Sequence, residues 1–324
     1  MSQPDDFHAI IEAAIRAPSG HNSQPWQFGL GDGRITIEPD FSRRLPAVDP
    51  DNRELFISLG CAVENLCLAA AHFGYAAQTN IHETGAIETA LHRQPENRRQ
   101  PENEALYAQI PCRQTNRAAC NGKTIPPAEL DNILTAMPSN GVSLHAFARG
   151  TPEFAALAQA VLAGNSAQMN DAAFKTELLS WIRFNRRHSE STRDGLSNAV
   201  MGAPNLPAWI SRSIIQTMLN ERRQNRSDRE KIAAASHLLL IVSTGDDTAS
   251  WVQTGRVLQR TLLTLTQHGI AHAYLNQPCE VPAQRAVLSQ LPALEGAHPQ
   301  ILLRLGYADA VPYSLRRAVE EVVR

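Results

Sequence analysis

The sequence predicts an α+β fold in which two related halves of one chain meet through two long central helices. Three observations predict it: a length of 324 residues, an internal repeat of one helix, and short strands bounded by turn residues. A chain of this length exceeds the size at which a single hydrophobic core usually stops growing, so two core-forming units are expected. Helices mixed with antiparallel hairpins favour the α+β class.

The repeated helix contains a glycine in each copy, Gly60 in the first and Gly255 in the second. Each is followed, after the same spacing, by a further glycine, Gly74 or Gly269, at a position typical of a left-handed helix end. A glycine inside a helix costs about 0.5–1 kcal/mol relative to alanine. Close approach of two helix backbones would offset that cost. We therefore expect the two helices to pack together at the centre of the molecule; two unrelated buried helices are the alternative.

A second, weaker match aligns residues 10–19 with residues 130–139, each a helix that ends in Pro-Ser and precedes a strand. Between its first strand and its long helix the second half carries an insertion at about 150–230. Thr151 is a good N-cap for a helix starting at Pro152, and the stretch is expected to be mostly helical. The insertion could be a lid or channel wall, or a passive cover.

The remaining elements follow from local patterns. Asp32-Gly33 predicts a hairpin turn between strands at 26–30 and 34–38. Further strands are expected at 75–81, 142–148, 236–242, 270–275 and 300–305, and a final helix at 314–323. We expect the first half to cover residues 1–110 and the second to cover 111–324.

Composition restricts the function classes. The formal charge of −2 gives no electrostatic case for a nucleic-acid or membrane partner. The N-terminus is acidic and does not resemble a secretory signal, and the five cysteines form no Cys-x-x-Cys pair. No His-Glu-x-x-His motif or Cys/His cluster predicts a metal site. A cytoplasmic protein without a metal is expected.

Two segments have residue patterns that indicate a ligand-binding site. Residues 17–26 read Ala-Pro-Ser-Gly-His-Asn-Ser-Gln-Pro-Trp, a turn-forming run that presents backbone N–H groups and short polar side chains. It could bind the edge of a planar heterocycle, or be an ordinary capped loop. In residues 112–117, Arg113 and Arg117 share one face whether the segment is extended or helical, and Thr115 lies between them if it is extended. Two converging guanidiniums suit a phosphate, although surface arginines are the alternative.

Together these segments resemble a known family. The Pro-Ser-x-x-Asn-Ser-Gln-Pro-Trp string at 18–26 is similar to the signature loop of nitroreductase-type FMN oxidoreductases, and Arg113-x-Thr115-x-Arg117 resembles their phosphate motif. Residues 303–307 and 314–317 resemble their closing strand and phosphate-binding arginine. Trp251-x-x-x-Gly255 and the run at 275–278 are similar to the long, fused Acg-like branch. The resemblance implies an internally duplicated pseudo-dimer with antiparallel sheets flanked by helices.

Each half retains what the other lacks. The phosphate motif precedes Pro138 of the second half, whereas the chain has no room for a counterpart ahead of Pro18. Conversely, the second half has lost the Gln-Pro-Trp that the first half keeps. In family members of the dimeric kind these two elements come from different subunits. The resemblance therefore implies one complete FMN site per chain, in a monomer shaped like a dimer, and it leaves further dimerisation open.

The resemblance also implies roles for particular residues. The FMN phosphate would be held by Arg113, Thr115, Arg117, Arg316 and, as an additional contact, Arg317. The ring and ribityl chain would meet Pro18, Ser19, Gly20, Asn22 and, as a further contact, Gln24. Lys231 would lie near the pyrimidine end, with an ordinary surface lysine as the alternative. The flavin's reactive nitrogen would be approached by backbone N–H groups of Leu275, Asn276 and Gln277.

The implied activity is transfer of hydride from NAD(P)H through FMN to a nitroaromatic, a quinone or a similar acceptor. The flavin performs the redox step, so no protein nucleophile is required. His21 could donate a proton to the substrate, with a purely structural histidine as the alternative. The rival functions are an FMN-sequestering protein closed by the insertion and a scaffold without activity.

Overall fold

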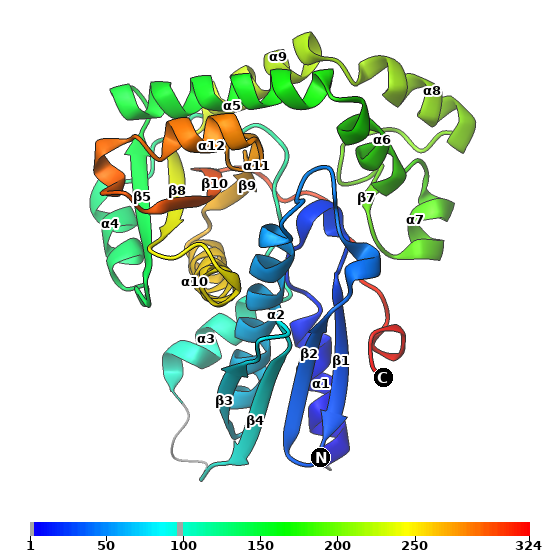
Figure 1. The fold of residues 1–324 in the computed structure, drawn as a ribbon, viewed down its shortest axis with the longest axis vertical. Helices are drawn as coiled ribbons and strands as arrows, with labels where there is room; N and C mark the ends of the chain where they lie inside the picture. Colours follow the sequence, from blue (N-terminus) through cyan, green and yellow to red (C-terminus); the bar gives the residue numbers. More distant parts are fainter. Residues whose placement is uncertain (1–2, 96–99) are drawn as a thin grey trace.

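The computed structural model describes residues 3–95 and 100–324 and contains two four-stranded antiparallel sheets on opposite sides of two crossing helices (Figure 1). In the first sheet the spatial order is β1-β2-β4-β3. Its strands are β1 (Trp26–Gly31), β2 (Arg34–Pro39), β3 (Tyr75–Ile81) and β4 (Ile87–Arg93). The turn between β1 and β2 contains Gly33 at φ +68°, as expected for this hairpin.

The second sheet has the order β5-β8-β10-β9, so its strands follow the same spatial order along the chain as those of the first sheet. They are β5 (Val142–Ala148), β8 (His237–Ser243), β9 (Ala271–Tyr274) and β10 (His298–Gly306). Strand pairs in both sheets are antiparallel throughout. Strand β4 was not predicted from the sequence. It pairs with both β2 and β3 and completes the first sheet.

The two sheets are joined by α2 (Arg53–His72) and α10 (Thr248–Gln267). A Cβ atom on Gly60 would overlap the carbonyl oxygen of Val252 and lie 2.9 Å from the Cα of Gly255, and a Cβ on Gly255 would overlap the carbonyl oxygen of Ile57. The predicted backbone contact between the repeated helices is therefore confirmed. By length and composition α2 could cross a membrane, but 83% of it is buried inside the fold.

One hydrophobic core runs through both halves. Phe28 of the first sheet, Leu262 of α10 and Leu303 of the second sheet are fully buried members of the same cluster. Three further helices surround this core: α1 (Gln3–Ala14), α3 (Pro101–Gln109) and α4 (Pro127–Thr135). Helix α1 precedes β1 as α4 precedes β5, which extends the correspondence between the halves. Because the halves share this cluster, neither buries its apolar surface alone.

The stretch between β5 and β8 is mainly helical and extends along one end of the molecule and down one side (Figure 1). It contains α5 (Pro152–Asn170), α6 (Ala172–Trp181), α7 (Arg186–Thr192), α8 (Ala208–Met218) and α9 (Glu221–Ala234). A small parallel pair, β6 (Ile182–Arg183) with β7 (Leu196–Ser197), ties its middle together. This stretch replaces the tight turn between β1 and β2 of the first half.

The predicted helix over 314–323 is wrong. The only helical turn in this described stretch is the 3-10 helix η5 (Val319–Glu321), and the tail instead returns to the first half. The backbone N–H of Phe28 donates to the oxygen of Val322 at 2.6 Å, and the N–H of Arg324 donates to the oxygen of Phe28 at 2.9 Å. Hydrogen bonds to the free edge of β1 thus replace those of a helix.

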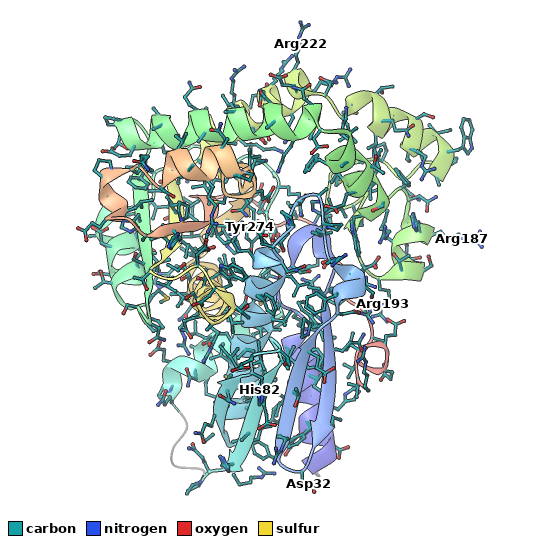
Figure 2. All side chains as sticks on the ribbon, viewed as in Figure 1. Asp32, His82, Arg187, Arg193, Arg222 and Tyr274 are labelled. Atoms are coloured by element: carbon teal, nitrogen blue, oxygen red, sulfur yellow. The ribbon has the colours of Figure 1, made fainter. Side chains whose placement is uncertain are left out.

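Short elements position the site described below. They are the 3-10 helices η1 (Gly20–Asn22), η2 (Phe41–Arg43) and η4 (Pro292–Leu294), and the short helices α11 (Gln277–Glu280) and α12 (Pro282–Leu288). Figure 2 places Tyr274, at the end of β9, near the middle of the molecule, whereas Asp32, Arg187 and Arg222 point outward at its margins.

Candidate FMN site

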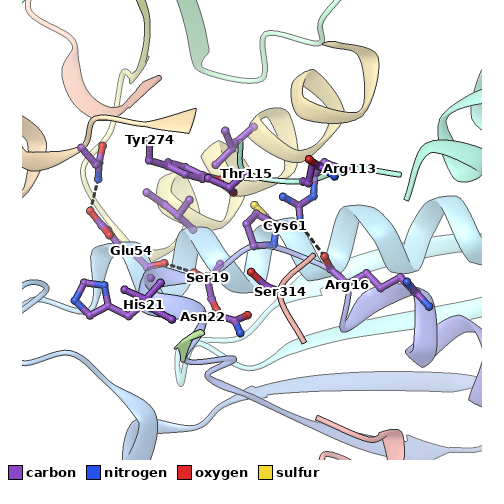
Figure 3. Close-up of a pocket in the computed structure, with 18 of the residues that line it drawn as sticks. Arg16, Ser19, His21, Asn22, Glu54, Cys61, Arg113, Thr115, Tyr274 and Ser314 are labelled. Atoms are coloured by element: carbon purple, nitrogen blue, oxygen red, sulfur yellow. Dashed lines mark hydrogen bonds between the residues drawn. The ribbon is translucent and has the colours of Figure 1, made fainter. Parts of the chain in front are cut away.

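A cavity of about 460 Å³ lies where the two halves meet (Figure 3). This volume is within the range of about 300–1,000 Å³ typical of small-molecule sites. Its lining comes from the start of α2 and from α10, β9, the segment at 110–117, the tail at 312–316 and the loop at 16–22. Both chemically loaded segments of the sequence therefore border one cavity, and Asn22 and Arg117 both line it.

The loop that contains Pro18, Ser19 and Gly20 is held in an unusual backbone conformation. His21, Asn22 and Gln24 all have positive φ angles, 49°, 55° and 53°, which non-glycine residues rarely adopt. Such strain persists only where surrounding contacts fix it, and it concentrates at binding sites. Here the side-chain amide of Asn22 donates to the carbonyl oxygens of Gly195 and Leu315, at 3.1 Å each. The insertion and the tail together hold this loop.

One wall of the cavity is cationic. Arg113 is 6% exposed and donates to the carbonyl oxygen of Arg16 at 3.0 Å. Arg316 donates to Oδ1 of Asn22 at 2.8 Å and to the carbonyl oxygen of Ala17 at 3.0 Å. Burial, with the nearby charges of Arg113 and Arg16, lowers the pKa of Arg316 to about 9. The positive charges of these neighbouring arginines thus add to the effect of burial.

The guanidiniums of this wall also have unused donors. The Nε atoms of Arg113 and Arg316 are buried and have no hydrogen-bond partner among the described residues. Within the same part of the chain, neither these two arginines nor Arg117 forms an ion pair with a carboxylate. Buried cations are normally paired, because an unpaired buried charge is costly. The wall is therefore complementary to a bound anion, and a phosphate matches its forked donors.

The segment that carries the phosphate motif is not helical, and Arg113, Gln114, Thr115 and Arg117 all line the cavity. Between them, Asn116 turns away and its side-chain amide donates to the carbonyl oxygen of Asp309 at 2.7 Å. Of the two geometries left open by the sequence, the helical one is therefore wrong.

The middle of the cavity is largely apolar. Ile57 and Cys61 of α2 line it beside Leu258 of α10, and Tyr274 lies over the opening between them (Figure 3). Burial raises the pKa values of both the Cys61 thiol and the Tyr274 hydroxyl, so both groups are neutral at physiological pH. This part of the cavity offers a neutral slot suited to a flat aromatic ring.

The end of the cavity away from the arginines is acidic, which the sequence did not indicate. Glu54 and Glu280 both line it. Burial raises the pKa of Glu54 well above its usual value, and the charge of Glu280 adds to the shift, while Arg53 opposes it. Asn276 donates its side-chain N–H to Oε1 of Glu54 and accepts from the backbone N–H of Leu302 at 3.0 Å. No sequence motif surrounds either glutamate.

The structure separates the predicted contacts into two groups. The residues that line the cavity are Pro18, Ser19, Gly20, Asn22, Arg113, Thr115, Arg117, Asn276 and Arg316. The others, Gln24, Lys231, Leu275, Gln277 and Arg317, do not belong to its lining.

Gln24 is completely buried beneath the loop, so its assignment as a ring contact is corrected. Its amide donates to the carbonyl oxygen of Arg193 at 2.9 Å and accepts from the backbone N–H of Arg317 at 2.9 Å. It therefore connects the loop to the insertion and the tail. Arg317 itself points along the tail, where its guanidinium donates to the carbonyl oxygen of Glu321 at 2.5 Å.

The segment after β9 also differs from expectation. The backbone N–H of Leu275 donates to the oxygen of Leu302 at 2.9 Å, so the sheet already uses it, and its side chain is buried in the core. Gln277 begins α11 and packs against Gly164 of the insertion. Lys231 lies in the last turn of α9, where burial and the charges of Arg304 and Arg117 lower its pKa. It lies behind the cationic wall instead of in it.

His21 lines the cavity but is poorly suited to donate a proton as an imidazolium. Burial, with the charge of Arg117, lowers the pKa of His21 to about 4, and its Nε2 has no partner among the described residues. The side chain is therefore neutral at physiological pH. Its uncharged ring contributes shape and one buried polar atom to the cavity.

This shift predicts a pH dependence of stability. Because the folded-state pKa is below the value of 6.5 in the unfolded chain, acid favours the unfolded state as pH falls from 6.5 toward 4. We expect His21 to remove about 2 kcal/mol of unfolding free energy between pH 7 and pH 5. In urea unfolding of the ligand-free protein, His21→Asn should lose less stability than the wild type by that amount. Asparagine tolerates the positive φ, and equal pH slopes for the two proteins would contradict this assignment.

Comparison with known proteins finds relatives that match nearly the whole chain. No family model matches the chain. It is 27% identical to "Putative NAD(P)H nitroreductase Rv3131" of Mycobacterium tuberculosis, over 98% of this chain and 91% of that protein. It is 26% identical to "Putative NAD(P)H nitroreductase acg" of the same organism, over 99% and 96%. The chain is therefore similar over nearly its full length to two putative nitroreductases, one of them acg. Among solved structures, the chain is similar to the FMN-dependent nitroreductase NfnB of Mycobacterium smegmatis at 16% identity, with a TM-score of 0.43, over 68% of this chain and 97% of that one.

Proposed function

We propose that this nitroreductase-like chain binds FMN in the cavity between its halves and uses it to pass hydride from NAD(P)H to a nitroaromatic, a quinone or a similar acceptor. The observation that carries the proposal is the pair of buried guanidiniums, Arg113 and Arg316, whose Nε donors have no partner among the described residues and which line the same cavity as the loop at 18–22. The names of the full-length relatives support the same activity.

The cavity fits FMN at three places. Arg113, Thr115, Arg117 and Arg316 would hold the phosphate, and the neutral slot beside Tyr274 would accept the ring. Asn22 and the backbone of the loop would orient the polar edge of the ligand, with Gln24 fixing the loop from behind. When bound, FMN supplies the hydride chemistry, and the protein binds, orients and excludes water.

The arrangement also supports one site per chain. We propose that residues 1–110 and 111–324 are duplicated halves, because their sheets share one strand order and α2 packs on α10 at equivalent glycines. The first half would supply the loop wall and the second the phosphate wall, so that a monomer carries a complete site.

Purification followed by absorbance spectroscopy tests the proposal. We expect a yellow protein with one FMN per chain, whose colour bleaches on anaerobic addition of NADPH and returns on addition of a quinone. A colourless protein that does not take up added FMN would refute FMN binding. A yellow protein that NADPH leaves unchanged would refute the reductase activity and favour sequestration.

Sequestration is the second candidate, because the insertion is bonded to the loop that lines the cavity. The N–H of Gly195 donates to the oxygen of Asn22 at 3.1 Å, and the Asn22 amide donates in return to Gly195. Beside them, Asp194 forms buried ion pairs with Arg43 of the first half and Arg183 of the insertion. These contacts close one side of the cavity, where Leu196 also lines it.

The substitution Asp194→Asn is expected to loosen this closure. Removing one partner of a buried ion pair typically costs about 3–5 kcal/mol, because the other charges stay unpaired. Part of this free-energy loss would destabilise the conformation in which the insertion contacts the loop. We therefore expect FMN to dissociate at least about 10-fold faster from the variant. Release can be followed by the rise of flavin fluorescence on dilution. Glu190→Gln, which removes an exposed ion pair with Arg186 in the same insertion, is the matched control. Equal release from both variants would argue against a lid.

A further inference from the structure

The cavity has two chemically different ends, and the guanidiniums that would hold a phosphate line only one of them. In Figure 3 Arg113 and Arg16 lie at one side, Glu54 lies at the other, and Cys61, Ser19 and Tyr274 lie between them. A phosphate held by the guanidiniums would leave the rest of the cavity, including its acidic end, to the remainder of the ligand and a second substrate. The carboxyl groups there therefore face the part of the site where a second substrate would react.

Glu54 has one oxygen tied to the protein and one directed to the loop. Its Oε1 accepts from the side-chain amide of Asn276 and from Arg53 at 3.2 Å. Its Oε2 lies 3.7 Å from the position that a Cβ on Gly20 would occupy, beside the backbone that borders the cavity. The residue is only 9% exposed, so the carboxyl reaches the cavity while remaining largely out of bulk water.

Three buried carboxyl groups gather around one guanidinium. Glu280 accepts a hydrogen bond from the side chain of Gln168 at 2.5 Å. Asp49 accepts from the backbone N–H groups of Glu54 and Leu55. The charge of Arg53 lowers the pKa of all three acids and so opposes the effect of their burial. Arg53 also donates to the carbonyl oxygen of Gln300 at 2.5 Å. One cation cannot compensate three buried carboxylates, and like-charged carboxyls that share a site retain a proton.

The groups that face Glu54 come from each neighbouring element. They are Arg53 of α2, Asp49 of the preceding loop, Tyr274 at the end of β9, and Cys279 and Glu280 of α11. The thiol and the phenol are neutral because burial raises their pKa values. The proton is therefore held among the three acids, and Glu54, whose Oε2 lies beside the loop that borders the cavity, is the acid placed to pass it to a bound acceptor.

We propose that Glu54, paired with Glu280, is the proton donor for the electron acceptor that binds at the acidic end of the cavity. The inference rests on the proposed function. A quinone becomes a hydroquinone by gaining one hydride, which the reduced cofactor loses, and one proton. That proton leaves Oε2 of Glu54, an O–H bond forms on the acceptor, and the carboxylate regains a proton from solvent after the product departs. Asn276 and Arg53 then stabilise the transient carboxylate through Oε1.

Stopped-flow kinetics of Glu54→Gln test the proposal. We expect FMN affinity and the rate of reduction by NADPH to stay within about 3-fold of the wild type, because Glu54 has no hydrogen bond or ion pair with Arg113, Arg117 or Arg316 among the described residues. Reoxidation by a quinone should slow by about 100-fold or more, the usual contribution of a positioned general acid. Glu88→Gln, on β4 at the surface, is the control and should leave both half-reactions unchanged. Unchanged reoxidation in Glu54→Gln would overturn the proposal.

Infrared titration of the ligand-free protein gives a second readout. The wild type should retain, at pH 7, the carbonyl band of a protonated carboxylic acid, and Glu54→Gln should lose it. In Glu280→Gln the band should persist but disappear at a lower pH, because the repulsion that raises the pKa of Glu54 is removed. Absence of the band in the wild type would overturn the proposal. A wild type that binds no FMN would refute the proposed function instead, and the infrared result would still decide whether Glu54 holds a proton.

Discussion

Replacing Arg113 with glutamine is expected to weaken FMN binding by about 100-fold, the largest loss among the lining residues. A buried charge-assisted pair with a phosphate contributes about 2–5 kcal/mol when one partner is removed, and 100-fold corresponds to about 2.7 kcal/mol. Arg113 is 6% exposed and has an unused Nε donor, so it needs little reorganisation to bind. The dissociation constant can be measured by titrating ligand-free protein with FMN and following flavin fluorescence.

The stability of the ligand-free Arg113→Gln variant distinguishes a phosphate-binding role of Arg113 from a purely structural one. Without ligand, Arg113→Gln should be no less stable than the wild type, because it removes a cation from a crowded positive cluster. Arg34→Gln, on β2 far from the cavity, should change neither FMN binding nor stability appreciably. Retention of wild-type FMN affinity by Arg113→Gln would show that the phosphate lies elsewhere.

The sequence predicts those parts of the site whose local residue pattern restricts the backbone conformation. The Pro-Ser-x-x-Asn run cannot continue a helix, and alternate residues of an extended Arg-x-Thr-x-Arg segment must share a face. The sequence also predicts that the Pro-Ser-x-x-Asn loop and the Arg-x-Thr-x-Arg segment border one cavity, because each predicted half contains only one of the two segments. The helix glycines, Gly60 and Gly255, were predictable for a related reason: their cost is offset only by close contact.

Other parts of the site depend on contacts that local patterns do not encode. Gln24 lies two residues beyond Asn22 in the same motif, yet its positive φ turns its side chain beneath the loop. Glu54 is an ordinary helix residue in the sequence, and only the packing of α11 against α2 brings Glu280 to it. The tail at 314–323 has a helical composition, but the open edge of β1 offers it stronger competing hydrogen bonds.

The insertion alters the chemistry of the site as well as its access. By bonding to Asn22, Gly195 fixes the strained loop in the conformation that exposes its backbone to the cavity. Burial is also what raises the pKa of Glu54. If the insertion acts as a lid, it would favour retention of FMN. Sequestration and catalysis would differ in how often the lid opens.

The central helix contact gives the largest expected effect on stability. In Gly60→Ala the new methyl group would overlap the carbonyl oxygen of Val252 and lie 2.9 Å from the Cα of Gly255, and backbone atoms cannot rotate away as a side chain would. The helices must separate, which opens the core that both halves share. We expect the unfolding free energy to fall by about 3 kcal/mol or more, despite a gain of about 1 kcal/mol from helix propensity.

Urea unfolding, followed by circular dichroism on ligand-free protein, measures this loss. Gly29→Ala is the matched control, because its Cβ would meet the nearest atom, on Thr36, at an ordinary 3.7 Å. Because Ile57 of α2 and Leu258 of α10 both line the cavity, separation of the helices should also weaken FMN binding in Gly60→Ala but not in Gly29→Ala. If the two variants unfold at the same urea concentration, the halves do not depend on this contact, and the spacing of the walls around FMN must be set by the sheets and the tail.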